Sequence, residues 1–99
     1  MVTIKIIQNT LTSGAPFSIR VLNGTLSDVT FTLEVEGQAR DFAMDGCPPQ
    51  PRITLRVPGG VPTLFQVENW GTAAVGSQVT LCAETSGKSR CSKPATVGA

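Results

Sequence analysis

The 99-residue chain is short, nearly neutral and free of histidine and tyrosine, and these properties exclude several classes of function. Eight Lys and Arg residues stand against seven Asp and Glu residues, a formal net charge of +1. Such a balance creates no chain-wide field that would gather nucleic acid or an anionic membrane. The length predicts one domain with one core. No run approaches the roughly 18 apolar residues of a membrane span.

Apolar and polar residues alternate with period two along the chain, and no stretch carries a helical stripe. Because side chains alternate across a strand, each such run buries one face. In chain order, the patterns predict strands at 2–7, 16–22, 28–36, 39–44, 52–57, 62–69, 77–84 and 88–92. Short strands at this spacing, separated by glycine, asparagine and proline turns, predict an all-β fold: a single antiparallel β-sandwich of seven to eight strands.

The apolar members of these runs form the predicted core, because the pleat places each run on one face. The set is Phe17, Ile19, Val21, Val29, Phe31, Leu33, Val35, Ile53, Leu55, Val57, Val67, Val79 and Leu81. The sandwich is expected to span residues 1–91. Residues 92–99, rich in Pro, Ala and Gly, are expected to form a C-terminal tail docked on a neighbouring molecule.

Asn23-Gly24 is a strong local hairpin signal, but the strand phases argue against a two-residue loop there. Pairing about this turn would set Phe17 opposite Thr30 and bring polar side chains to the buried face. A longer connection through Ser27 restores Val29 to the core face. The sequence therefore predicts a loop that crosses from one sheet to the other.

Two stretches, Phe17 to Gly37 and Leu64 to Ala83, share a pattern of strand, Asn-x-Gly/Thr and strand. This pattern resembles bacterial immunoglobulin-like domains, which include adhesion-related repeats, modules appended to secreted enzymes and the C-terminal domain of cytochrome oxidase assembly proteins. The resemblance covers about half of the chain and its motifs are mostly turn chemistry. It implies an immunoglobulin-like sandwich and leaves the function open, because such sandwiches serve many unrelated roles.

The cysteines are the most specific chemical feature of the sequence. A two-residue turn at Ser86-Gly87 would place Cys82 directly opposite Cys91. We therefore predict a Cys82–Cys91 disulfide on the outer face of a hairpin, with Cα atoms about 4.5 Å apart. The alternative is a pair of reduced cysteines in an intracellular protein. Cys47 is left as a spare thiol, a partner of either other cysteine, or an intermolecular link.

Several stretches resemble functional motifs without completing them. Gly87-Lys88-Ser89 resembles the end of a phosphate-binding loop, but position 82 is Cys rather than the leading glycine. Asp41 and Asp45-Gly46 lack the intermediate oxygen ligands of a calcium loop. Without histidine, a serine or cysteine nucleophile lacks its usual base, and zinc lacks a fourth ligand. We therefore expect a protein that is not an enzyme and holds no cofactor and no metal.

Trp70, in a loop-like Asn-Trp-Gly context, is the main candidate for a protein interface, because aromatic side chains at loop tips anchor interfaces. The alternative is that Trp70 plugs the open end of the sandwich. Lys93 and Pro94, in the tail, complete the predicted interface. Lys88 and Arg90 form a small basic patch with Lys93, which we expect to be a solvated rim.

These features predict a non-catalytic structural or attachment module that contacts protein subunits in a multi-copy assembly. It is expected to use no nucleic acid, no membrane insertion and no small-molecule substrate. The favoured setting is a virion surface, as a small capsid decoration or cement protein, because the chain opens at Met1 without a leader and is nearly neutral. The alternative is an immunoglobulin-like accessory or adhesion domain of a secreted or periplasmic bacterial protein. The cysteines favour that extracellular or periplasmic location.

Overall fold

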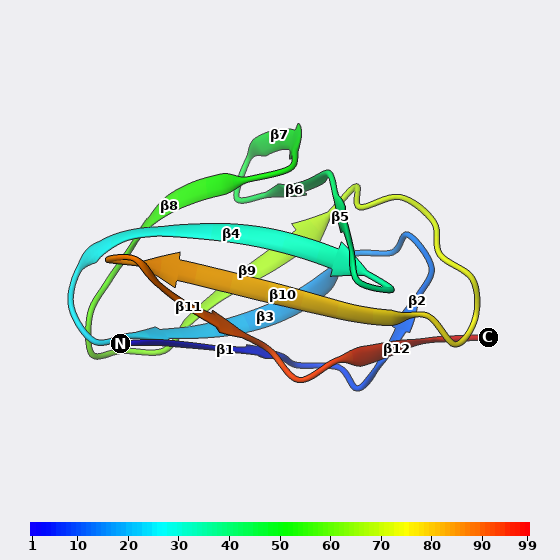
Figure 1. Cartoon of the computed structure of the whole chain (residues 1–99), viewed down its shortest axis with the longest axis horizontal. Helices are drawn as coiled ribbons and strands as arrows, with labels where there is room; N and C mark the ends of the chain where they lie inside the picture. Colours follow the sequence, from blue (N-terminus) through cyan, green and yellow to red (C-terminus); the bar gives the residue numbers. More distant parts are fainter.

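The computed structural model describes all 99 residues and contains twelve strands in two sheets, with no helix. The long strands run along the length of the molecule, and the two chain ends lie at opposite ends of it (Figure 1). In chain order they are β1 Val2–Ile6, β2 Thr10–Thr12, β3 Phe17–Asn23, β4 Ser27–Val35, β5 Gln38–Arg40, β6 Phe42–Met44, β7 Cys47–Gln50, β8 Ile53–Val57, β9 Thr63–Glu68, β10 Gln78–Thr85, β11 Lys88–Cys91 and β12 Ala95–Gly98.

The two sheets have different strand orders. The first sheet has the order β1-β3-β9-β6-β7, and the second has the order β2-β12-β10-β4-β5, with β11 beside β10 and β8 beside β4. Every pair is antiparallel except β2 with β12, which is parallel. The second sheet is therefore mixed, whereas the sequence predicts a purely antiparallel sandwich.

The core lies between the sheets, as the alternation predicts. Every residue of the predicted core set is buried except Leu55, which is half-buried. The observed core also includes Phe42, Met44, Trp70 and Val97. Period-two patterning is therefore sufficient to find the inner faces of the long strands β3, β4 and β10.

The connection after Asn23 crosses between the sheets, which confirms the prediction from strand phases. β3 belongs to the first sheet and β4 to the second. The buried Asn23 side chain holds this crossing, since its Nδ2 donates to Ser27 Oγ at 2.8 Å and to the Val57 carbonyl at 3.4 Å. A buried amide with both partners supplied fixes the loop without an unsatisfied polar group.

The twelve strands exceed the predicted seven to eight, for local reasons. The predicted 39–44 strand is two strands, because the chain changes sheets at Asp41 between β5 and β6. β2 contains one buried residue, Leu11, and is too short to show an alternating pattern. β7 contains Pro48 and Pro49, which argue against a strand but are tolerated at the sheet edge where β7 lies.

Residues 95–98 form β12, so the predicted boundary at residue 91 and the separate tail are wrong. β12 pairs with β10 and with β2 of the same chain. Ala95 and Val97 are buried, with Thr96 between them half-buried. The segment has the same alternation as the other strands, and its Pro and Gly neighbours obscured it. The C-terminal segment therefore packs on the sandwich of its own chain.

Candidate interaction surfaces

Trp70 lies in the core, so the expected interface through its side chain is wrong and the plug alternative describes the structure. The side chain is 0% exposed. Its ring packs edge-on against Phe17, with centroids 5.6 Å apart and an interplanar angle of 84°. Its Nε1 donates to the Ala15 carbonyl at 2.8 Å. Both the apolar ring and the polar nitrogen are thus satisfied inside the chain.

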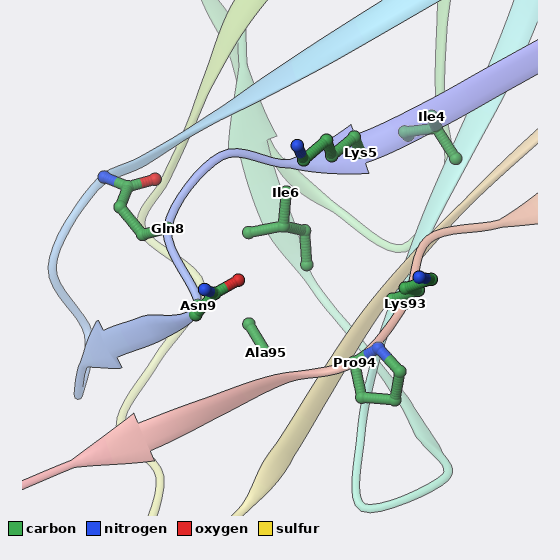
Figure 2. Close-up of a pocket in the computed structure, with 8 residues that line it drawn as sticks. All are labelled: Ile4, Lys5, Ile6, Gln8, Asn9, Lys93, Pro94 and Ala95. Atoms are coloured by element: carbon green, nitrogen blue, oxygen red, sulfur yellow. The ribbon is translucent and has the colours of Figure 1, made fainter.

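Lys93 and Pro94 are exposed, and they form the link between β11 and β12. The pairing with β10 shifts by one residue across this link, from Cys82 opposite Cys91 to Gln78 opposite Thr96. A one-residue shift is a β-bulge, which bends the strand away from its partner. The bend leaves a depression of about 310 Å³ between the link and the end of β1 (Figure 2).

The predicted Cys82–Cys91 disulfide is present, in the register that the Ser86-Gly87 turn predicts. The two Cα atoms are 4.0 Å apart. Cys82 shares its face of β10 with the half-buried Thr80 and the exposed Glu84, so the bridge lies on the outer face of the second sheet. It joins β10 to β11 and is a structural clamp on that hairpin.

The remaining motif-like residues lie in separate places. Cys47 is a half-buried free thiol in β7, opposite Met44. Asp41 lies between β5 and β6, and Asp45 lies in the tight turn before β7. No group of three or more His, Cys, Asp or Glu side chains is placed to hold a metal ion. Gly87-Lys88-Ser89 forms the end of a hairpin turn and the start of β11.

A cluster of exposed apolar side chains lies at the end of the sandwich opposite Trp70. We call it the loop-end patch, and its members are Leu22, Leu26, Val61, Pro62 and Leu64. Leu22 lies near the end of β3 and Leu64 near the start of β9, and the other three lie in the loops that follow β3 and β8, at the left end of Figure 1. The exposed fraction of the leucine and valine residues runs from 42% for Leu22 to 67% for Leu64.

Backbone contacts hold this patch together. Leu64 pairs with Arg20 on β3, so it lies diagonally beside Leu22 on the outer face of the first sheet. Leu22 and Pro62 line one shallow depression. The loops carrying Leu26 and Val61 touch through Gly59, where an added Cβ would lie 2.6 Å from the Leu26 nitrogen. Sequence reasoning missed the patch because its members come from two segments, 22–26 and 61–64, that are far apart in the chain.

The chain matches no family model, no curated protein and no solved structure. None of its segments forms a long apolar helix of the kind that crosses a membrane.

Proposed function

We propose that the chain is a non-catalytic attachment module with an immunoglobulin-like sandwich, which binds a protein subunit through the loop-end patch. The strand orders support the fold part of this proposal. The order β1-β3-β9-β6 corresponds to A-B-E-D, and β12-β10-β4-β5 corresponds to G-F-C-C′ of variable-type immunoglobulin domains. β2, which follows β1 and pairs with β12, then corresponds to the part of strand A that moves to the other sheet.

The loop-end patch carries the functional part of the proposal. Apolar side chains that gather on a surface and are rimmed by polar residues are typical of protein interfaces. Arg20, Thr3 and Gln66 lie at the rim on the same sheet face. At the opposite end, by contrast, the large aromatic Trp70 is buried within the chain. The patch is therefore the apolar surface that a partner would cover.

We place this module on a virion surface, as a decoration or cement protein in many copies. A patch of leucine, valine and proline suits permanent contact with a neighbouring subunit, because obligate contacts are more apolar than transient ones. The net charge of +1 also gives little long-range steering toward a mobile ligand. Catalysis is no part of this proposal.

A second candidate function rests on the Cys82–Cys91 disulfide. Disulfides persist in secreted and periplasmic proteins and are rare in the reducing cytosol. The bridge therefore favours an accessory or adhesion domain of an extracellular or periplasmic bacterial protein. The two candidates differ in copy number, because an accessory domain occurs once per host chain.

Photo-cross-linking tests the proposal directly. A benzoylphenylalanine at Val61 should cross-link to a single partner protein in particles that contain the chain. The matched control is the same residue at Val75, which is also exposed and apolar but lies outside the patch. Quantitative mass spectrometry should find the chain in many copies per particle. A free monomer that gives no cross-link from Val61 would overturn the proposal, and a single copy fused to a larger chain would establish the second candidate.

A further inference from the structure

Most cations of this nearly neutral chain are gathered along β1. Five of the eight Lys and Arg residues line three depressions that all include residues of β1, and no Asp or Glu lines any of them. We call these five residues the basic strip: Lys5, Arg20, Lys88, Arg90 and Lys93. The rest of the chain keeps three cations against seven acidic residues, a net charge of −4 beside a strip of +5. The balanced sequence conceals this segregation of charge.

Lys5 is the centre of one group of cations in the strip. It pairs with Arg20 on β3, so two exposed cationic side chains stand directly opposite each other on the outer face of the first sheet. Lys93, in the link after β11, lines one depression together with Lys5. Like charges in directly opposite positions destabilise a sheet. The chain has two ion pairs, and neither involves a residue of the basic strip, so this repulsion is not neutralised within the chain.

A second group of cations lies beside the N-terminal end of β1. Lys88 and Arg90 on β11 are exposed and line one depression together with Met1 and Val2. The Arg90 guanidinium donates to the Met1 sulfur at 3.6 Å, which places this group next to the start of the chain. Four residues of extended chain, from Met1 to Lys5, span about 13 Å. The two groups therefore form a strip, and a ligand that contacts both must carry several negative charges in a row.

The depression at the Lys5 end also offers neutral groups to a ligand (Figure 2). Gln8 and Asn9, from the turn after β1, line it together with Lys5 and Lys93. Both amide side chains are exposed and can donate hydrogen bonds. The exposed Pro94 adds an apolar surface to the same depression. A sugar ring presents hydroxyl groups and C–H faces, so amides beside a proline ring suit a saccharide.

We propose that the basic strip binds an acidic polysaccharide, whose successive sulfate or carboxylate groups contact the two groups of cations. Its hydroxyl groups accept hydrogen bonds from the Gln8 and Asn9 amides. A protein partner is disfavoured here, because lysine is depleted in protein interfaces and their centres hold few charges. Single-stranded nucleic acid is disfavoured because no aromatic side chain lines the three depressions to stack on bases.

Calorimetric titration with oligosaccharides tests the proposal. One probe is a sulfated hexasaccharide of the heparin type, a second is a hyaluronan hexasaccharide with carboxylates alone, and neutral maltohexaose is the control. At least one acidic probe should bind, and the double variant Lys5→Gln/Lys93→Gln should weaken that binding by about tenfold. The matched variant Arg52→Gln/Arg56→Gln removes the same charge outside the strip and should weaken it less than about twofold. Comparison of the two acidic probes tells which anionic group the strip prefers.

Several results would overturn the proposal. Absence of binding by both acidic probes would leave the strip as a solvated surface, and equal weakening by both double variants would mean charge attraction without a site. Unchanged binding in Lys88→Gln/Arg90→Gln would exclude a ligand that spans the strip. Tighter binding of hexaglutamate or of a single-stranded oligonucleotide would assign the strip to a protein or to nucleic acid. Because Val61 lies outside the strip, Val61→Ser should leave probe binding intact, so failure of the attachment proposal is read separately.

Discussion

The apolar loop residue Trp70 is buried at one end of the sandwich, whereas Leu26 and Val61 are exposed at the other. At one end, Trp70 turns inward because Phe17 offers a ring and Ala15 a carbonyl. At the other end, the loops are tied by their backbones, with Gly60 N donating to the Asn23 carbonyl at 2.8 Å, while Leu26 and Val61 stay outside. An ordered loop does not by itself bury its side chains. Burial requires a partner of matching shape and polarity within the chain.

The largest expected effect is at the Trp70 end, where β12 and β2 close the second sheet. Deleting residues 92–99 removes the buried Ala95 and Val97 and leaves Leu11 without its parallel partner. A domain of this size has only about 5 to 15 kcal/mol of stability. We expect the truncated chain to be unfolded by circular dichroism and by amide dispersion in NMR spectra. A folded truncated chain would show that this end is not closed by β12.

Substituting Trp70 tests the plug itself. Trp70→Ala should lower the free energy of unfolding by about 3 to 5 kcal/mol, because it leaves a cavity and orphans the Ala15 carbonyl. Trp70→Phe keeps a ring against Phe17 and should cost less. Urea unfolding followed by circular dichroism gives both values. Leu26→Ala, at the opposite end, is the control and should change stability by under about 0.5 kcal/mol.

Two glycines sharpen the comparison at the level of the backbone. A Cβ at Gly59 would lie 2.5 Å from the Thr25 Cα, and a Cβ at Gly98 would lie 2.5 Å from the Thr10 Cγ2. The Thr25 Cα belongs to the backbone and is held by its chain neighbours, whereas the Thr10 methyl group can rotate away from an added Cβ. We expect Gly59→Ala to cost about 1 to 3 kcal/mol and Gly98→Ala distinctly less, by urea unfolding. Similar costs at both sites would mean that the loop-end backbone is more pliable than its contacts indicate.

The smallest expected effect on stability is in the loop-end patch. Val61→Ser and Leu64→Ser should change the free energy of unfolding by under about 0.5 kcal/mol, because both side chains are exposed. Binding to the cross-linked partner should nevertheless weaken by more than about 1 kcal/mol. That binding should depend little on salt, because the patch residues are apolar. Pronounced unfolding of either variant would show that the patch belongs to the core.

The long strands and the disulfide could be predicted from sequence because both depend on residues close together in the chain. The strands follow from alternation of apolar and polar residues, and the disulfide follows from the register about one tight turn. Alternation in 28–36 gives the inner face of β4, and the turn at Ser86-Gly87 gives the Cys82–Cys91 pairing. The same count also sets Arg90 opposite Ala83, as observed, with Arg90 exposed.

The features that sequence reasoning missed depend on contacts between distant segments. Trp70 faces inward because its Nε1 donates to the Ala15 carbonyl. Ala15 is 55 residues away in the sequence, so no pattern near Trp70 indicates this partner. β12 is a strand because its backbone pairs with β10 on one side and β2 on the other, although its flanking Pro and Gly suggest a loop. Pro48 and Pro49 are compatible with β7 only because that strand is at an edge, which is a property of the whole sheet.

The parallel ladder between β2 and β12 has a consequence for biosynthesis. It joins Leu11 to Val97, so the β2–β12 ladder cannot form until β12 has been synthesised. Contacts so distant in sequence impose a large loop-closure entropy and slow the final step of folding. Until then Leu11 and the side of β10 that receives β12 lack the strand that covers them in the folded domain.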